Sequence, residues 1–322
     1  MGRSVLIFIV ILTCINDTFS QSAPAVDENI PYLVTFGADS KTSWGDDDFC
    51  QIFFFRIPVS QTEPVFIRVY DPDTGGDIDE QKGEFNTVMR FSVYGGVGCW
   101  SDKDAQATAP VGNYKSGILL STKTFGNDPK YNKNYYTFGP FNPFEGENVK
   151  KLNGRVFKVI AEGVSGDDGN LYRYFLSTRP DDNVAVEGGN VFTYKYHFRL
   201  PNDQSQVTQI YPYIDDKTVS IEISNFDWDN DGTIKIISVA KDGITCAISG
   251  DNNWVARKFP IVEEEKNTSI EIQFVKNQTQ KVLNNNVVVV VRNQYGLSLP
   301  FFVVPIGGVP VYTPKIRMKV VQ

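Results

Sequence analysis

Histidine is nearly absent from this chain, with one residue among 322. A catalytic triad or a multi-histidine metal site would have to use His197, which lies in the alternating segment Tyr194–Arg199. The sequence also lacks a Gly-x-Ser-x-Gly elbow, a phosphate-binding loop and a dinucleotide fingerprint. We expect His197 to be an ordinary strand residue and the protein to be non-catalytic. The alternative is a secreted hydrolase, in particular a glycoside hydrolase that uses two of the 38 Asp and Glu side chains.

Basic charge and long apolar runs are also scarce. The chain has 31 Lys and Arg against 38 Asp and Glu, a formal net charge of −7, which gives nucleic acid no electrostatic reason to bind. Beyond the N-terminal segment, even the all-valine run Val287–Val291 is far too short to span a bilayer. We therefore expect no nucleic-acid partner and no transmembrane segment in the mature chain.

The N-terminus has the three parts of a secretory signal peptide. Arg3 supplies the positive charge, Val5–Ile15 the apolar run, and small or polar residues end at Ser20. We expect residues 1–20 to be the signal peptide and residues 21–29 to be a linker. The Ser20–Gln21 junction resembles that of exported proteins of the Bacteroidetes type. We therefore expect the protein to be exported to the periplasm, the cell surface or the medium.

Cysteine is rare, and three cysteines would remain after cleavage: Cys50, Cys99 and Cys246. None lies in a Cys-x-x-Cys pattern, so neither a redox motif nor a zinc site is indicated. Export permits oxidation, and Cys50 and Cys99 each lie beside a strand-like segment, so these two could form a disulfide. The equal alternative is three buried free thiols.

Helical patterns are scarce, and apolar residues instead alternate with polar ones between turns rich in Gly, Pro, Asn and Asp. This predicts an all-β chain of two antiparallel β-sandwich domains, of jelly-roll or immunoglobulin-like type. The break at Pro201–Gln206 divides them into residues 30–203 and 204–322. The predicted strands are Gln51–Ile57, Val65–Tyr70, Val88–Tyr94, Arg155–Ala161, Leu171–Leu176, Val191–Phe198, Val219–Ile223, Thr233–Val239, Ile270–Val275 and Val287–Val291. Ser101–Asn148 is expected to form long loops.

An acidic cluster follows the predicted strand Val65–Tyr70. Five acidic side chains lie within ten residues, around Gly75 and Gly76. Calcium takes six to eight oxygen ligands, and a tight turn can fold carboxylates and carbonyls around one point. The alternative is a solvated hairpin loop in which Asp and Gly supply turn geometry. The calcium hypothesis has the ligand candidates Asp71, Asp73, Asp77, Asp79 and Glu80.

The acidic cluster belongs to a longer series of motifs. It follows Trp44–Phe49, and it precedes a strand ending in Tyr94-Gly95-Gly96 and the motif Ser165-Gly166-Asp167-Asp168-Gly169-Asn170-Leu171-Tyr172. Together these resemble the bacterial pre-peptidase C-terminal (PPC) type of β-sandwich domain, over about residues 30 to 200. The resemblance implies a jelly-roll domain of secreted or surface proteins, many of which bind calcium. Unlike the usual setting, no catalytic domain accompanies it here, and Ser101–Asn148 is a long insertion.

A second acidic cluster lies between two predicted strands in the C-terminal half. Its Asp-x-Asp-x-Asp-Gly pattern matches the first half of an EF-hand loop, but the twelfth position is Ser238 and the flanks are strands. Calcium binding of another kind is one interpretation. The other is a turn that places Phe226 and Trp228 in the core. The ligand candidates are Asp227, Asp229 and Asp231.

Aromatic residues are plentiful, and many lie in Tyr131–Phe144. Exposed rings beside amides and charges suit stacking on sugars or contact with a protein partner, whereas rings tucked inward would cover one end of a sandwich. We expect an exported, non-catalytic protein of the bacterial envelope or cell surface. It would have calcium-stabilised sandwiches and present loops to a polysaccharide or a surface protein.

Overall fold

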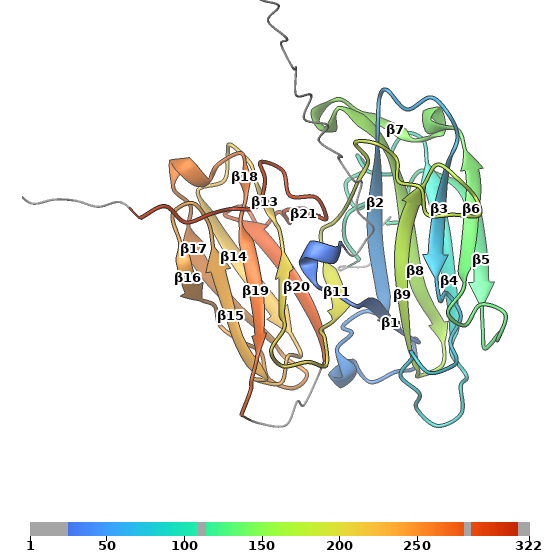
Figure 1. The fold of residues 1–322 in the computed structure, drawn as a ribbon, viewed down its shortest axis with the longest axis horizontal. Coiled ribbons are helices and arrows are strands. Elements are labelled where there is room, and N and C mark those ends of the chain that lie inside the picture. The colour runs from blue at the N-terminus through green and yellow to red at the C-terminus, as the bar shows by residue number, and fades with distance from the viewer. Residues whose placement is uncertain (1–24, 109–113, 280–284, 315–322) are drawn as a thin grey trace, which may run out of the picture.

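The computed structural model describes residues 25–108, 114–279 and 285–314, and it has two β-sandwiches side by side (Figure 1). The all-β prediction is confirmed, because the described residues have only 3₁₀ turns besides strands, and every strand pair is antiparallel. None of the helical turns in the described residues has the length and apolarity of a membrane span. The predicted signal peptide lies outside the described residues.

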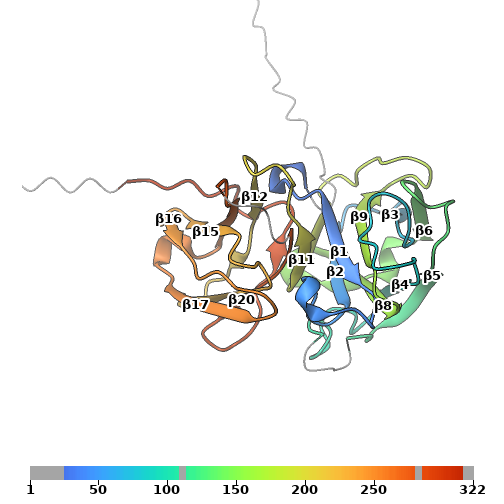
Figure 2. The same cartoon turned by 90° about the horizontal axis from the view of Figure 1, so that it is seen from below.

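One eight-stranded sheet runs through both sandwiches. Its β11 pairs with β1 of the first sandwich on one side and with β20 of the second on the other. Figure 2 shows β11 between the two bodies. In spatial order the strands are β17 (Trp254–Pro260), β14 (Ser220–Phe226), β20 (Asn286–Asn293), β11 (Tyr196–Arg199), β1 (Tyr32–Phe36), β9 (Gly169–Ser177), β3 (Val65–Tyr70) and β6 (Tyr135–Phe141).

A seven-stranded sheet completes the first sandwich. Phe53 of this sheet lies 5.0 Å from Tyr174 of β9, ring centre to ring centre, and Phe91 lies 5.2 Å from Tyr172, so aromatic rings fill the space between the sheets. The strands are β21 (Phe301–Phe302), β10 (Asn190–Thr193), β2 (Cys50–Pro58), β8 (Gly154–Ser165), β4 (Val88–Gly95) and β5 (Ile118–Phe125), with β7 (Glu147–Val149) beside β8.

A four-stranded sheet completes the second sandwich. Phe274 of this sheet contacts Phe198 of β11 and Trp228. The strands are β12 (Val207–Ile210), β19 (Glu271–Lys276), β15 (Gly232–Ile237) and β16 (Asp242–Thr245); β13 (Tyr213–Ile214) and β18 (Thr268–Ser269) form a separate pair. The connection between the predicted domains lies before β12, and β21 returns from the C-terminal part to pair with β10. The two sandwiches therefore share strands.

The prediction of long loops over residues 101–148 is wrong in part, because this stretch contains β5, β6 and β7. β5 is an edge strand whose residues are mostly exposed or half-buried, so it lacks the apolar alternation that reveals a strand. The aromatic residues Tyr131, Tyr136 and Phe138 contact one another or Phe125. Of the predicted aromatic surface, Phe144 is the exposed ring.

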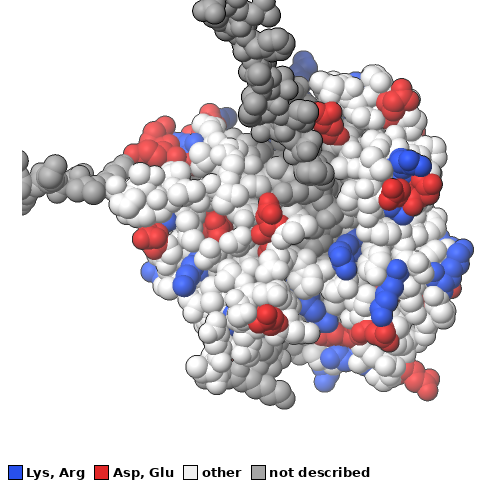
Figure 3. Space-filling view, viewed as in Figure 1, with Lys and Arg blue, Asp and Glu red and all other residues white. Residues whose placement is uncertain are grey.

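On the face seen in Figure 3, acidic and basic side chains are interspersed over both sandwiches. The net negative charge of the chain is thus not gathered into one acidic patch on this face. Mixed surfaces of this kind favour solubility without a strong single-sign field.

The segment predicted as a linker is partly built into the fold. Residues Val26–Glu28 form a 3₁₀ turn, and the Glu28 Oε2 atom accepts hydrogen bonds from the Ala25 N–H and the Tyr196 O–H, each at 2.9 Å. Glu28 is fully buried, and burial raises its pKa to about 8. At neutral pH the folded protein therefore keeps a proton that the unfolded chain releases.

Glu28→Gln should make stability less dependent on pH. In the wild type the free energy of unfolding falls as the pH rises from 4.5 towards 8, because only the unfolded chain loses the proton, at about 1.4 kcal/mol per pH unit. The neutral glutamine removes this fall, which urea unfolding at pH 5, 7 and 9 would measure. The exposed Glu63→Gln is the control, and parallel pH curves for wild type and Glu28→Gln would contradict the prediction.

Candidate metal centre

The first acidic cluster forms a turn at the end of β3 that lies against the loop joining β5 to β6. Asp71 has a left-handed backbone (φ 56°), and its Oδ1 accepts the Lys133 N–H at 3.0 Å. The Asp73 Oδ2 accepts the Asp128 N–H at 3.3 Å. Asp79 accepts the Gly75 and Leu171 N–H groups at 2.8 and 2.7 Å. Backbone donors from three segments thus hold the carboxylates in place.

These three carboxyl groups are crowded and shielded from water. Burial raises the pKa of Asp71 to about 6. Burial and the charge of Asp71 raise the pKa of Asp73 to about 7. Burial also raises the pKa of Asp79 well above its ordinary value, and the charges of Asp71 and Asp73 add to the rise. The charges of Lys133 and Arg173 oppose the rise at Asp71 but do not cancel it.

Oxygen atoms without hydrogen-bond partners surround the same turn. They are Asp73 Oδ1, Thr74 Oγ1, Asn132 Oδ1 and Asn170 Oδ1, all buried. Asn170 is held at the turn because its Nδ2 donates to the backbone oxygen of Asp73. A buried oxygen left unpaired costs about 1–3 kcal/mol. Asp71, Asp73, Thr74, Asp79, Asn132 and Asn170 are called the acidic-loop site below.

The glycines of the turn are needed for its close packing against the β5–β6 loop. A Cβ atom on Gly75 would lie 2.8 Å from Asn127 Oδ1, and one on Gly76 would lie 3.1 Å from the Asn132 side-chain amide. Gly76 also has a left-handed backbone (φ 77°). The close approach brings amide side chains of the β5–β6 loop next to the turn that carries Asp71 and Asp73. Carboxylate, amide and hydroxyl oxygens are the kinds of ligand atom that calcium takes in proteins.

The side chains of two residues predicted as ligands are engaged in ion pairs outside the acidic-loop site. Asp77 is 87% exposed and pairs with Lys133 at 2.9 Å. Glu80 forms an ion pair with Arg199 of β11. Asp71, Asp73 and Asp79 are the predicted ligands that lie at the acidic-loop site, whereas Asn132 and Asn170 were not among the predicted residues. The sequence held no signal for Asn132, whereas Asn170 lies in the Gly-Asp-Asp-Gly-Asn motif already noted.

The second acidic cluster is rearranged relative to the expectation. Carboxylate oxygens of Asp227, Asp229 and Asp251 lie within 4.8 Å of one another, and Asp251 was not among the predicted residues. Asp231 instead lies 3.4 Å from the Lys276 ammonium, and both side chains are buried. Trp228 is fully buried, so the turn also serves the packing role given as the alternative.

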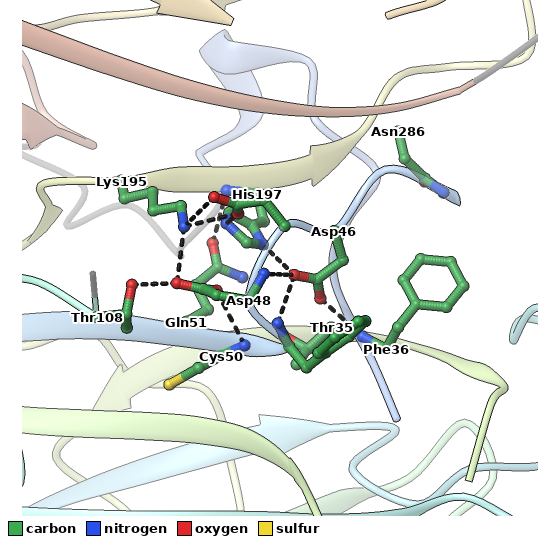
Figure 4. A network of polar contacts seen from close by, with 12 residues as sticks. Thr35, Phe36, Asp46, Asp48, Cys50, Gln51, Thr108, Lys195, His197 and Asn286 are labelled. Atoms are coloured by element: carbon green, nitrogen blue, oxygen red, sulfur yellow. Dashed lines mark hydrogen bonds and ion pairs between the residues drawn. The ribbon is translucent and has the colours of Figure 1, made fainter. Parts of the chain in front are cut away.

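A buried ionic network lies where β11 meets the residues before β2 (Figure 4). His197 is completely buried, with Nδ1 3.4 Å from Asp46 Oδ1 and Nε2 3.3 Å from Asp47 Oδ1. Asp46 also accepts the N–H groups of Phe36 and Phe49, at 2.9 and 2.8 Å. The Lys195 ammonium lies 2.6 Å from Asp47 and 2.7 Å from Asp48. Asp46, Asp47, Asp48, Lys195 and His197 form the Asp–His–Lys network.

The network supplies its own positive charge. Burial lowers the pKa of His197, but the charges of Asp46 and Asp47 outweigh burial and raise it. Burial would raise the pKa of Asp47, but His197 and Lys195 lower it to about 2. Ligand atoms of Asp46, Asp47, Asp48 and His197 lie within 4.8 Å of one another, so the same groups could hold a metal ion. The Lys195 ammonium already lies beside Asp47 and Asp48 and offsets part of their charge. The expectation that His197 is an ordinary strand residue did not include this network. The run of three aspartates, Asp46–Asp48, is a local sign of it in the sequence.

The cysteines are free thiols in the structure. Cys50, Cys99 and Cys246 are all buried and unpaired as disulfides, which corresponds to the alternative stated above. The Cys99 thiol donates a hydrogen bond to the Val156 carbonyl at 3.2 Å. Burial raises the pKa of Cys99 to about 12 and that of Cys246 to about 11, so neither thiol is reactive at neutral pH.

The resemblance to PPC-type domains stays a prediction drawn from the motifs. A scan against protein-family models and a search of curated proteins both find no match to this chain.

Proposed function

We propose that this protein is an exported, non-catalytic β-sandwich protein that holds a calcium ion at the acidic-loop site and presents a binding surface to a polysaccharide or protein partner. The observation that carries the calcium proposal is the set of buried oxygens without partners around Asp73, beside carboxyl groups with raised pKa values. A divalent cation would satisfy these oxygens and neutralise the carboxylates. Its role is structural, because it would tie the turn after β3 to the β5–β6 loop.

Two observations favour a binding role over the hydrolase alternative. His197 is held between Asp46 and Asp47 with no exposed surface, which removes the one histidine from contact with a substrate. A glycoside hydrolase needs two carboxyl groups facing each other across a cleft. In the cavity of about 620 Å³ at the junction of the sandwiches, the carboxylates are Asp215 and Asp216, which are adjacent in sequence. Asp215 caps its own turn by accepting the Lys217 N–H and the Thr218 O–H.

Calcium is expected to raise the melting temperature relative to the protein in EDTA. A ligand that binds only the folded state, at a hundred times its dissociation constant, adds about 2.7 kcal/mol. Asp73→Asn should abolish the shift and should melt no lower than wild type in EDTA, because it removes one crowded carboxylate. Differential scanning calorimetry with calcium, magnesium and EDTA measures both effects.

The matched control is Asp77→Asn, which changes an exposed aspartate of the same turn. This variant should keep the full calcium shift. An equal shift in Asp73→Asn and in wild type, or no shift in wild type at saturating calcium, would contradict the acidic-loop site.

A further inference from the structure

A groove lies at the junction between the two sandwiches. It consists of two cavities of about 620 and 340 Å³ that share the lining residues Gln106, Tyr194, Leu297 and Ser298. This combined space, called the junction groove below, has the size of a ligand site for a molecule of several rings. It is distinct from the acidic-loop site, since none of the residues of that site lines it.

Aromatic side chains are distributed along the junction groove. Tyr213 of β13 lies in the larger cavity, where its ring meets Phe302 edge to face at 6.1 Å. Trp100 lies in the same cavity, and its Nε1 donates to the Tyr194 hydroxyl at 3.0 Å. Trp254 of β17 lines the smaller cavity and is 41% exposed. Of these rings, Trp254 is the most exposed, and exposed aromatic rings suit stacking against the apolar faces of sugar rings.

The junction groove is positive although the chain is negative. Five basic side chains line it, against three acidic ones, in a protein of formal charge −7. Lys195 is neutralised by Asp47 at 2.6 Å, so four basic groups face two acidic groups. Amide side chains add neutral hydrogen-bonding groups. The charged residues are Lys103, Lys151, Lys195, Lys217, Arg292, Asp47, Asp215 and Asp216; the amides are Gln106, Asn267 and Asn293.

The walls of the junction groove are fixed by the fold. Lys195 and Asp47, which line the smaller cavity, are held in the Asp–His–Lys network. Phe302 and Phe192, which lie on paired strands β21 and β10, form part of the floor of the larger cavity, with ring centres 4.9 Å apart. A preformed groove binds an extended ligand at a lower entropic cost than loops that must order first.

We propose that the junction groove binds a linear polysaccharide that carries carboxylates, such as a uronic-acid polymer. Aromatic rings spaced along an open groove favour a chain of sugar rings over a single small molecule. The excess of Lys and Arg selects chains with negative charge by electrostatic complementarity. This inference rests on the proposed binding function and assigns its surface and its substrate class.

The test is calorimetric titration of the protein with polygalacturonate and alginate oligomers at low salt. Dextran oligomers serve as the neutral polymer and poly-glutamate as an acidic peptide. The acidic sugars should bind, more weakly as salt is added, and the neutral polymer should bind at least about tenfold more weakly. No binding of either uronate, or binding of poly-glutamate as tight as that of the uronates, would overturn the proposal.

Single substitutions test whether the uronate binds in the junction groove. Trp254→Ala should weaken uronate binding about tenfold, as expected for a central aromatic contact, while Phe144→Ala, at an exposed ring outside the groove, should not. Lys217→Glu should weaken it about threefold at low salt, while Lys123→Glu on β5, at the far edge of the first sandwich (Figure 1), should not. Equal losses in groove variants and their controls would overturn the assignment.

Failure of the uronate proposal can be distinguished from failure of the calcium proposal. Titrations are repeated with the Asp73→Asn variant in EDTA, where neither the acidic-loop site nor the polymer holds calcium. Uronate binding in that variant supports the junction groove even if the calcium shift is absent. A clear calcium shift in wild type without uronate binding overturns the junction groove alone.

Discussion

Replacing His197 with glutamine is expected to lower the free energy of unfolding by about 3–5 kcal/mol, the cost of removing one partner from a buried ion pair. The His197 ring lies between Asp46 and Asp47, at 3.4 and 3.3 Å, and none of its surface reaches solvent. Glutamine fills part of the space but carries no charge. Asp46 and Asp47 would then face each other with the Lys195 ammonium as the remaining cation near them.

The position of His197 makes the loss large. β11 is the strand that pairs with β1 of the first sandwich and β20 of the second, with His197 opposite Val288. The His197 N–H also donates to the Gln51 side chain of β2 at 2.9 Å. The substitution should therefore destabilise both sandwiches together. We expect one unfolding transition, shifted to a lower urea concentration.

The pH dependence gives the same prediction a second readout. The pKa of His197 is raised above its ordinary value of 6.5, so its contribution is complete below that pH and is lost as the pH rises through the raised pKa. The pKa of Asp47 is lowered from 3.8 to about 2, so its contribution is complete above about 3.8 and is lost as the pH falls towards 2. The free energy of unfolding of the wild type should therefore fall more steeply above pH 6.5 than that of His197→Gln.

Chemical unfolding at pH 5.5 and pH 8 measures both effects. A triple variant, His197→Gln with Asp46→Asn and Asp47→Asn, should recover part of the loss, because no uncompensated carboxylate is then left beside the glutamine. The control is Lys258→Gln, which breaks a 3.7 Å surface pair with Glu222 and should cost less than about 1 kcal/mol. A His197→Gln loss no larger than this control would contradict the structural role of the network.

Strands with strong patterns could be predicted from the sequence, and weakly patterned ones could not. Val287–Val291 was expected to be buried on both faces, and these valines are indeed buried within β20. Val65–Tyr70 alternates and coincides with β3. The predicted strand Val191–Phe198 is instead divided between β10 and β11, which belong to different sheets. Only the tertiary arrangement decides where a continuous apolar pattern passes from one sheet to another.

The candidate site was predictable in its local part. Asp71, Asp73 and Asp79 lie on one turn, and their spacing around two glycines predicts that they share it. Asn132 comes from another loop and reaches the turn through the pairing of β3 with β6. The Asp–His–Lys network brings Asp46 and His197 together across most of the first sandwich's sequence. The apolar periodicity of one segment carries no information about contacts between residues that are far apart in the sequence.

The second sandwich has its own buried ion pair, and breaking it should be as costly as breaking the network around His197. The Lys241 ammonium lies 2.5 and 2.6 Å from the two Glu265 oxygens, and the side chains are 7% and 0% exposed. Glu265 also accepts the Val262 N–H at 2.9 Å and the Ser238 hydroxyl proton. The pair therefore fastens the β15–β16 turn to the segment that leads into β18.

Lys241→Met should lower the free energy of unfolding by about 3–5 kcal/mol, because methionine leaves the Glu265 carboxylate buried without its cation. The double variant Lys241→Met with Glu265→Leu should regain most of this loss, since no buried charge remains. Lys266→Met is the control, as its partner Glu263 is 84% exposed, and it should cost less than about 1 kcal/mol. Urea unfolding distinguishes the cases, and a double variant no more stable than Lys241→Met would show that the loss comes from packing and not from the unpaired charge.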